Sequence, residues 1–171
     1  MHLIRTLLRL LIGGLFIGHG TQKLFGWFGG YGPDGTGQFF ESIGLRPGRR
    51  NAMVAGAAEA GGGTLLALGL FTPVAGALLT GVMSQAIRSL KMDKGPFATD
   101  EGWELEALFA AAALTIVEIG PGPISLDHAL GTEHSGTGWA LLALAAGVAG
   151  PSLVVEGGDG APAQPAAQAQ A

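Results

Sequence analysis

The sequence contains no cysteine. This absence excludes disulfide bonds, thiolate nucleophiles, iron–sulfur ligation by the chain and cysteine-based zinc sites. A redox role would therefore need a quinone, another bound cofactor or a partner protein. No covalently bound cofactor is expected.

Charge is also scarce. Charged residues make up 13% of the 171 residues, against roughly 25% in an ordinary soluble domain, and the mean hydropathy is +0.42. The net charge is −4 and no basic stripe is present, so nucleic acid is not an expected partner. Several apolar stretches are about as long as a bilayer is thick, which predicts an all-α membrane protein whose solvent is the lipid bilayer.

Four apolar segments predict the spans of a four-transmembrane-helix bundle, which we assign to residues 1–135. The segments are residues 3–26, 51–71, 74–92 and 103–119. The first segment lacks an A-x-A cleavage site and continues past a signal-peptide core, so we expect a retained helix. The connection between the first two spans predicts a glycine-rich turn over 29–35 and a short interfacial helix over 38–43.

Two further segments follow the predicted bundle. Residues 136–155 are apolar but short, and Gly150-Pro151 interrupts them, so they form either a fifth transmembrane helix or an interfacial one. Residues 156–171 are rich in Ala, Pro and Gln and have almost no large apolar side chain. We expect this segment to be a disordered tail.

The stretch from Gly13 to Trp27 combines small and polar residues within the first predicted span. Gly14 and Gly18 form a GxxxG step, which predicts a close approach by a second helix. His19 and Lys23 lie one helical turn apart with Gln22 beside them, so the three share a face.

Polar residues of all four predicted spans fall in one half of the bilayer. At 1.5 Å per residue, His19, Glu59 and Gln85 each lie about 10 Å from the ends of their helices, on the same side. The members of this set are His19, Gln22, Lys23, Glu59, Gln85, Arg88, Glu104 and Glu106. Intramembrane ionisable residues are costly unless they are paired, so the set is a candidate functional site.

The charges in this set balance, with Lys23 and Arg88 against Glu59 and one of Glu104 or Glu106. We expect Glu59 to pair with His19 or Lys23. One interpretation is a salt-bridge lock that fixes helix register. The other is a polar pocket for a headgroup, a quinone ring or a proton relay. No metal site is predicted.

Basic residues are unevenly divided between the two predicted faces of the membrane. Seven belong to the side of the connections between the first and second and between the third and fourth spans: Lys23, Arg46, Arg49, Arg50, Arg88, Lys91 and Lys94. Arg5 and Arg9 belong to the other side. The count favours a cytoplasmic location for the first side.

The chain resembles the DoxX family of bacterial integral membrane proteins. The resemblance covers roughly residues 7–128 and rests on residues 18–32 (GHGTQKLFGWFGGYG), 39–48 (FFESIGLRPG), 59–63 (EAGGG), 97–104 (FATDEGWE) and 120–122 (GPG) followed by 125–127 (SLD). It implies a four-helix membrane core in the cell membrane. The segment after His134 departs from the shorter members of the family.

Relatives in this family are described as membrane subunits of thiosulfate:quinone oxidoreductases. A mycobacterial relative is described as joining a membrane-associated complex with superoxide dismutase and a sulfurtransferase. The resemblance thus implies a multi-pass membrane subunit of a redox complex, with a quinone as ligand. A small-solute or proton-coupled transporter and a scaffold for soluble redox enzymes are the alternatives. Oligomeric state and catalytic activity of the chain alone stay open.

Overall fold

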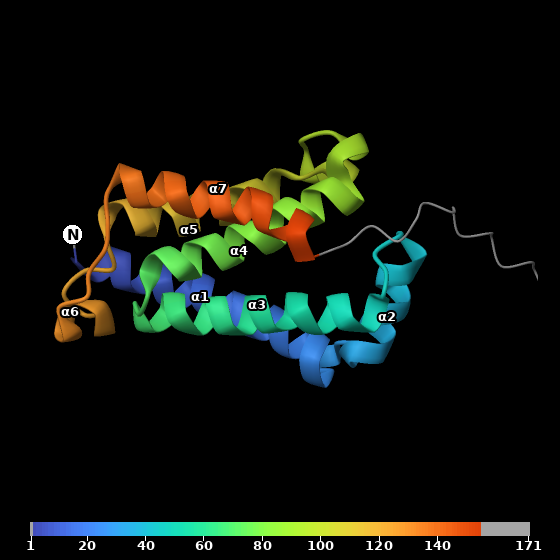
Figure 1. Cartoon of the computed structure of the whole chain (residues 1–171), viewed down its shortest axis with the longest axis horizontal. Coiled ribbons are helices and arrows are strands. Elements are labelled where there is room, and N and C mark those ends of the chain that lie inside the picture. Colours follow the sequence, from blue (N-terminus) through green and yellow to red (C-terminus); the bar gives the residue numbers. More distant parts are fainter. Residues whose placement is uncertain (1, 155–171) are drawn as a thin grey trace, which may run out of the picture.

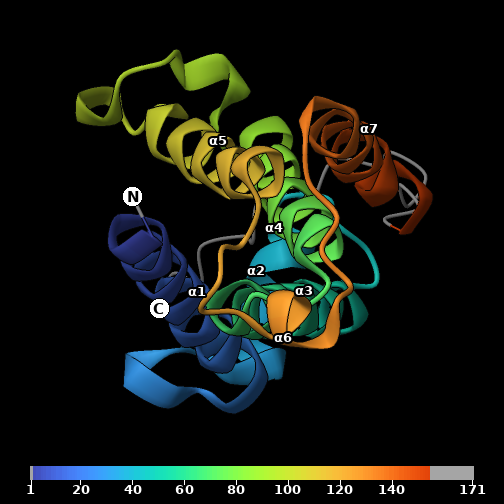
Figure 2. The same cartoon turned by 90° about the vertical axis from the view of Figure 1, so that its left-hand side faces the viewer.

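The computed structural model describes residues 2–154, and its regular elements are helices. Five long helices share one direction (Figure 1): α1 (His2–Phe25), α3 (Gly48–Leu68), α4 (Thr72–Ala86), α5 (Glu104–Ile119) and α7 (Thr137–Val154). Seen along that direction, α4 is central, with α1 and α3 on one side of it and α5 and α7 on the other (Figure 2). The all-helical class predicted from the sequence is confirmed.

Shorter elements close the two ends of the bundle. At one end lie the 3₁₀ turn η1 (Trp27–Gly29), α2 (Gly32–Ser42), a π turn η2 (Ile87–Lys91) and the 3₁₀ turns η3 (Met92–Lys94) and η4 (Ala98–Asp100). The opposite end carries α6 (Leu126–Leu130). We call these the α2 end and the α6 end.

The core lies where α1, α3, α4 and α5 meet. Its fully buried apolar side chains include Phe16 of α1, Leu66 of α3, Leu79 of α4 and Ile116 of α5. Phe16 also packs edge-to-face on Phe109, with ring centroids 5.6 Å apart. These contacts join the two sides of the molecule through α4.

Glycines bring α1 and α3 into close contact, but they are not the predicted pair. A Cβ on Gly13 would lie 2.5 Å from the carbonyl oxygen of Gly63, and one on Gly20 would lie 2.6 Å from that of Gly56. Nothing lies within 4 Å of a Cβ built on Gly14 or on Gly18. The prediction that the GxxxG step receives the neighbouring helix within the fold is therefore wrong, and that step faces outward.

The predicted turn over 29–35 is only partly correct, because α2 already begins at Gly32. Pro33 in the first turn of α2 has a φ suited to a helix start. Gly37 and Gly48 lie where α2 crosses the start of α3, and a Cβ on Gly37 would lie 2.8 Å from Arg49 Cα. The glycines of α2 thus serve helix packing as well as turning, and the short helix predicted over 38–43 is the second half of α2.

The third predicted span, 74–92, ends earlier as an α-helix than expected. The α-helical hydrogen bonding of α4 gives way after Ala86 to the π turn Ile87–Lys91. Gln85 Nε2 donates to Ser89 Oγ across this junction at 2.6 Å. Bulges of this kind break the regular ladder and are frequent at functional sites.

Residues 137–154 form the helix α7, which packs on α4 and α5. Pro151 has no N–H for the carbonyl of Gly147, and Ser84 Oγ of α4 donates to that carbonyl at 3.2 Å. Arg88 donates to Val148 O at 2.5 Å and to Ser152 Oγ at 3.1 Å. Polar contacts therefore hold the end of α7 to α4 through Ser84 and to the π turn η2 through Arg88.

Large apolar side chains are exposed along the outer faces of the helices, as with Leu11 on α1 (62% exposed) and Leu108 on α5 (63% exposed). Such surfaces suit a lipid environment. Among the described helices, α1 alone is both long and apolar enough to cross a membrane, and α7 contains a shorter apolar stretch. The count of four spans and the crossing by α7 therefore stay predictions. The predicted tail, 156–171, lies outside the described residues.

Candidate functional site

An ion pair lies at the centre of the α1–α3 contact. Lys23 Nζ donates to Glu59 Oε2 at 2.6 Å. Glu59 is only 3% exposed, while the Lys23 side chain is 22% exposed. The close approach at Gly20 and Gly56 lets the ammonium of α1 reach the carboxylate of α3. The predicted pairing of Glu59 with Lys23 is confirmed.

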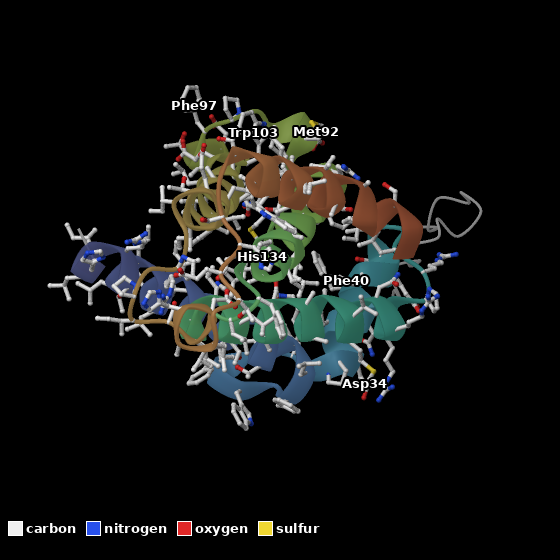
Figure 3. All side chains as sticks on the ribbon, turned by 60° about the vertical axis from the view of Figure 1, so that its left-hand side comes forward. Asp34, Phe40, Met92, Phe97, Trp103 and His134 are labelled. Atoms are coloured by element: carbon white, nitrogen blue, oxygen red, sulfur yellow. The ribbon has the colours of Figure 1, made fainter. Side chains whose placement is uncertain are left out.

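This ion pair forms part of the wall of a cavity of about 840 Å³. The wall is mainly apolar and comes from α2, α3, α4 and α7, with the ends of α1 and η1 at its margin. Its residues include Thr36, Phe39 and Phe40 of α2; Val54, Ala55 and Ala58 of α3; Val74, Ala77, Leu78 and Val82 of α4; and Trp139, Leu142 and Ala146 of α7. Figure 3 shows Phe40 near the α2 end, between the ribbons of α3 and α7.

The cavity follows α4 and the π turn η2 after it, from Pro73 to Leu90. At 1.5 Å per residue this is about 25 Å, close to the depth of a bilayer core. Its α6 end is lined by apolar residues such as Val74 and Trp139, whereas Lys23 and Glu59 line it further toward the α2 end. The cavity can therefore hold a long amphipathic molecule with its polar group toward the α2 end.

Asn51 is a cavity residue that the sequence analysis did not single out. It lies in the first turn of α3, is 4% exposed, and lines the cavity. Neither its amide nitrogen nor its amide oxygen has a hydrogen-bond partner among residues 2–154. Asn51, Ala55 and Glu59 follow one another at four-residue spacing along one row of α3, so the sequence could have placed Asn51 near Glu59, although it does not show the burial of Asn51.

The predicted α1 residues are divided between the cavity and the outer surface. Gln22 and Lys23 line the cavity. His19 is exposed on α1, where its Nδ1 lies 3.1 Å from Gln22 Oε1. His19 thus reaches the polar group only through Gln22, and within the described structure it is not part of the cavity wall.

The sequence analysis balanced Arg88 against Glu104 or Glu106, and the structure does not pair these residues. Arg88 turns to the end of α7, and Lys91 of the π turn pairs instead with Glu106 of α5 at 2.8 Å. Glu104 is half-buried at the start of α5. Of the predicted residues beyond α1 and α3, Gln85 lines the cavity, while Arg88 and Glu104 are not in its described wall.

A second buried polar cluster lies at the α6 end and was missed. Arg9 is 2% exposed and donates to the carbonyl oxygens of Ala67 (3.1 Å), Ile124 (2.8 Å) and Pro121. The sequence analysis treated Arg9 as a basic residue marking that face of the membrane. Its spacing from the buried Ile12 and Phe16 already places it on the core face of α1.

Asp127 completes this cluster and is fully buried. Its carboxylate accepts from the N–H groups of Phe71 (2.9 Å) and Thr72 (3.0 Å), and from the hydroxyls of Thr72 (2.8 Å) and Thr132 (3.1 Å). Burial alone would raise the pKa of Asp127, but these hydrogen bonds outweigh it and lower the pKa. Asp127 therefore caps the start of α4 and holds Phe71 at a φ of +47°.

Within residues 2–154, no group of three or more His, Asp or Glu side chains is arranged to hold a metal ion. Neither the curated proteins nor the solved structures compared with the chain give a match. The family model described as DoxX matches residues 4–92, just over half of the 171 residues. This segment holds α1 to α4, and with them the Lys23–Glu59 pair, Asn51 and Gln85. The chain belongs to the DoxX family of membrane proteins.

Proposed function

We propose that this protein is the membrane subunit of a redox complex and binds a lipid-soluble quinone in the cavity beside α4. The observation that carries the proposal is the cavity itself, whose apolar length leads to the buried Lys23–Glu59 pair. Such a shape suits a ligand with a long apolar tail and a polar ring. A phospholipid or a fatty acid also has a long apolar tail, so the experiment must test whether the cavity binds a quinone ring.

The polar wall of the cavity supplies both kinds of hydrogen-bonding group. The ammonium of Lys23 and the amide of Gln85 can donate to a ring carbonyl, and the carboxylate of Glu59 can accept from a ring hydroxyl. The chain contains no cysteine, so electrons for the ring would come from a bound group or from a partner protein. Superoxide dismutase and a sulfurtransferase are the proposed soluble partners, by family resemblance.

The proposal is tested with two matched variants of α3. Ala58 lines the cavity and the adjacent Ala57 is exposed on the outer face, so Ala58→Leu fills the cavity and Ala57→Leu does not. The purified protein in mild detergent is titrated with a tritiated short-chain ubiquinone. We expect saturable binding by the original chain and by Ala57→Leu, and an affinity at least about tenfold lower for Ala58→Leu, with similar melting temperatures.

Equal binding by both variants, or no saturable binding by the original chain, would overturn the quinone site. Proteins and small molecules that copurify from native membranes are identified in parallel, and we expect a quinone together with soluble redox enzymes. Recovery of the partners without a quinone would favour the scaffold. Solute flux in reconstituted vesicles, without quinone binding, would favour the transporter.

A further inference from the structure

The wall of the cavity carries one positive and one negative charge. Among the described residues that line it, Lys23 is the one basic residue and Glu59 is the one acidic residue. The two side chains are joined at 2.6 Å, so the wall presents no net charge to a ligand. Lys91 and Glu106 pair with one another at 2.8 Å and are not in this wall.

The ion pair has hydrogen-bonding groups to spare. An ammonium has three N–H groups, and both oxygens of a carboxylate can accept. Within residues 2–154, Lys23 Nζ donates one hydrogen bond, to Glu59 Oε2, and Glu59 Oε1 accepts none. Oε1 is not one of the buried atoms that lack both a partner and accessible surface. Since Glu59 is only 3% exposed and lines the cavity, the accessible surface of Oε1 faces the cavity.

The cavity is apolar between the ion pair and the α6 end. Its wall there consists of side chains such as Val74, Leu78 and Trp139. Glu59 lies ten positions before Gly69, the C-cap of α3, so this stretch is about 15 Å long. An extended dodecyl chain can fill such a length. The cavity therefore offers one polar position beside a narrow apolar space.

We infer that the cavity selects amphiphiles by charge: it binds a neutral polar group that both donates and accepts hydrogen bonds, and it rejects ionised head groups of either sign. The inference uses the cavity of the proposed function, but it does not depend on a quinone ring. A hydroxyl group of the ligand donates to Oε1 of Glu59 and accepts from Nζ of Lys23, so it satisfies the spare groups of both residues.

An ionised head group would upset the balance of charge. An anion would share Lys23 with Glu59, and a cation would share Glu59 with Lys23. In either case one charge would stay unbalanced among apolar side chains, which is costly because no water replaces the lost hydration. The Lys23–Glu59 pair thus acts as the specificity determinant of the cavity.

The test compares three dodecyl compounds that differ in the charge of the head group: 1-dodecanol, dodecyl sulfate and dodecyltrimethylammonium. Each competes with tritiated 1-dodecanol for the full chain in a mild nonionic detergent, at concentrations that leave the melting temperature unchanged. Glu59→Gln makes the wall positive, Lys23→Met makes it negative, and the double variant is neutral again. Asp34→Asn is the control, because it removes a charge from the exposed ion pair with Arg49, outside the cavity wall.

We expect dodecanol to compete at least about tenfold better than either ion with the original chain and with Asp34→Asn. Glu59→Gln should prefer dodecyl sulfate, and Lys23→Met should prefer dodecyltrimethylammonium. The double variant should again prefer dodecanol. An ion pair that only holds α1 against α3 would alter the melting temperature of the variants but not the order of the competitors.

The inference is wrong if the original chain shows no saturable binding of dodecanol, or if either ion competes as well as dodecanol does. Where a single variant does not fold, the double variant decides, and a preference of the double variant for an ion would equally refute charge selection. Dodecanol binding with the expected order, but no saturable binding of ubiquinone, would support charge selection and refute the quinone site of the proposed function.

Discussion

At the residue scale, the molecule contains two buried charged clusters that bind different kinds of partner. Lys23 and Glu59 satisfy one another next to the cavity. Arg9 and Asp127 instead bind backbone groups, since Arg9 donates to carbonyls and Asp127 accepts N–H groups at the start of α4. A charge that serves the backbone holds loops in place, whereas a pair on a cavity wall can also serve a ligand.

The carboxylate of Asp127 should set the stability of the α6 end. Asp127→Asn keeps the shape but replaces an acceptor oxygen with a donor NH₂, which faces donors from Phe71, Thr72 or Thr132. We expect a loss of about 2–4 kcal/mol in the free energy of unfolding, because a network of hydrogen bonds to a charged group is broken. The melting temperature in detergent checks this, with Glu133→Gln in the same loop as the control.

The contribution of Asp127 to the free energy of unfolding should also depend on pH, and the direction of this dependence follows from the pKa of Asp127. The pKa of Asp127 is lowered in the folded protein, so the folded state favours the carboxylate over the neutral acid. Its contribution is fully present above the ordinary pKa of about 3.9 and is lost as the pH falls through the lowered value. Acidification should thus destabilise the original chain more than Asp127→Asn in this range. If the melting temperatures of the two proteins fell equally as the pH is lowered, the stabilising role of the Asp127 carboxylate would be wrong.

Residue-level prediction from the sequence succeeded for the Lys23–Glu59 pair, because charges at equal depth in a membrane must meet or be exposed. It failed for Arg9, because a basic residue near the start of a span ordinarily reaches the headgroups. It also passed over Asn51, since a neutral side chain carries no charge to balance. Its burial without a hydrogen-bond partner and its place beside a cavity depend on how several helices pack, which the spacing along one helix does not give.

At the element scale, glycines of α1 decide how closely it packs on α3. A Cβ on Gly13 would meet backbone atoms of Gly63, which cannot move aside as a flexible side chain could. A Cβ on Gly14, one position along the same helix, would meet nothing within 4 Å. The two adjacent glycines therefore offer a matched pair of substitutions that differ only in the face they occupy.

Gly13→Ala should separate the two helices and lower the melting temperature strongly, with a cost of about 1–3 kcal/mol from overpacking. Gly14→Ala should be neutral or stabilise by up to about 1 kcal/mol, since alanine is the better helix former. Melting in detergent checks the difference. A Gly13→Ala variant as stable as Gly14→Ala would show that α1 and α3 do not pack as described.

The helices themselves were largely predictable, whereas their rotation was not. Long apolar runs and the breaks at Gly26 and Gly120-Pro121 mark α1 and α5 in the sequence, whereas the predicted span 51–71 runs past Gly69, where α3 ends. A helix in lipid is apolar on its outer face as well as its inner face, so hydrophobic periodicity does not identify the packed side. For this reason the sequence analysis took Gly14 and Gly18 as the packed surface, although Gly13 and Gly20, seven residues apart, are the glycines that contact α3.

At the scale of the whole molecule, the two ends differ in charge and in construction. The α2 end carries the basic Arg46, Arg49 and Arg50 together with the exposed aromatic rings of Trp27 and Tyr31. At the α6 end Arg9 is buried and Arg5 donates to Ile119 O at 2.7 Å, so both arginines are engaged by the protein. The excess of exposed basic residues at the α2 end is thus larger than the sequence count alone indicates.

The bilayer orientation and the crossing by α7 can be tested with single cysteines, because the chain has none of its own. Ser42 and Thr99 are exposed near the α2 end, and Ala129 is exposed at the α6 end. A cysteine replaces one of these, or Gly158 beyond the described residues, and intact spheroplasts are treated with a membrane-impermeant maleimide. The positive-inside rule predicts that the α2 end lies in the cytoplasm.

We therefore expect Ala129→Cys to be labelled in intact spheroplasts, and Ser42→Cys and Thr99→Cys only after lysis. If α7 crosses the bilayer, Gly158→Cys behaves like Ser42→Cys, because α7 runs from the α6 end toward the α2 end. Labelling of Gly158→Cys together with Ala129→Cys would make α7 an interfacial helix. The α7 wall of the cavity would then lie outside the membrane core, and a tail-bearing quinone could not reach it from the lipid.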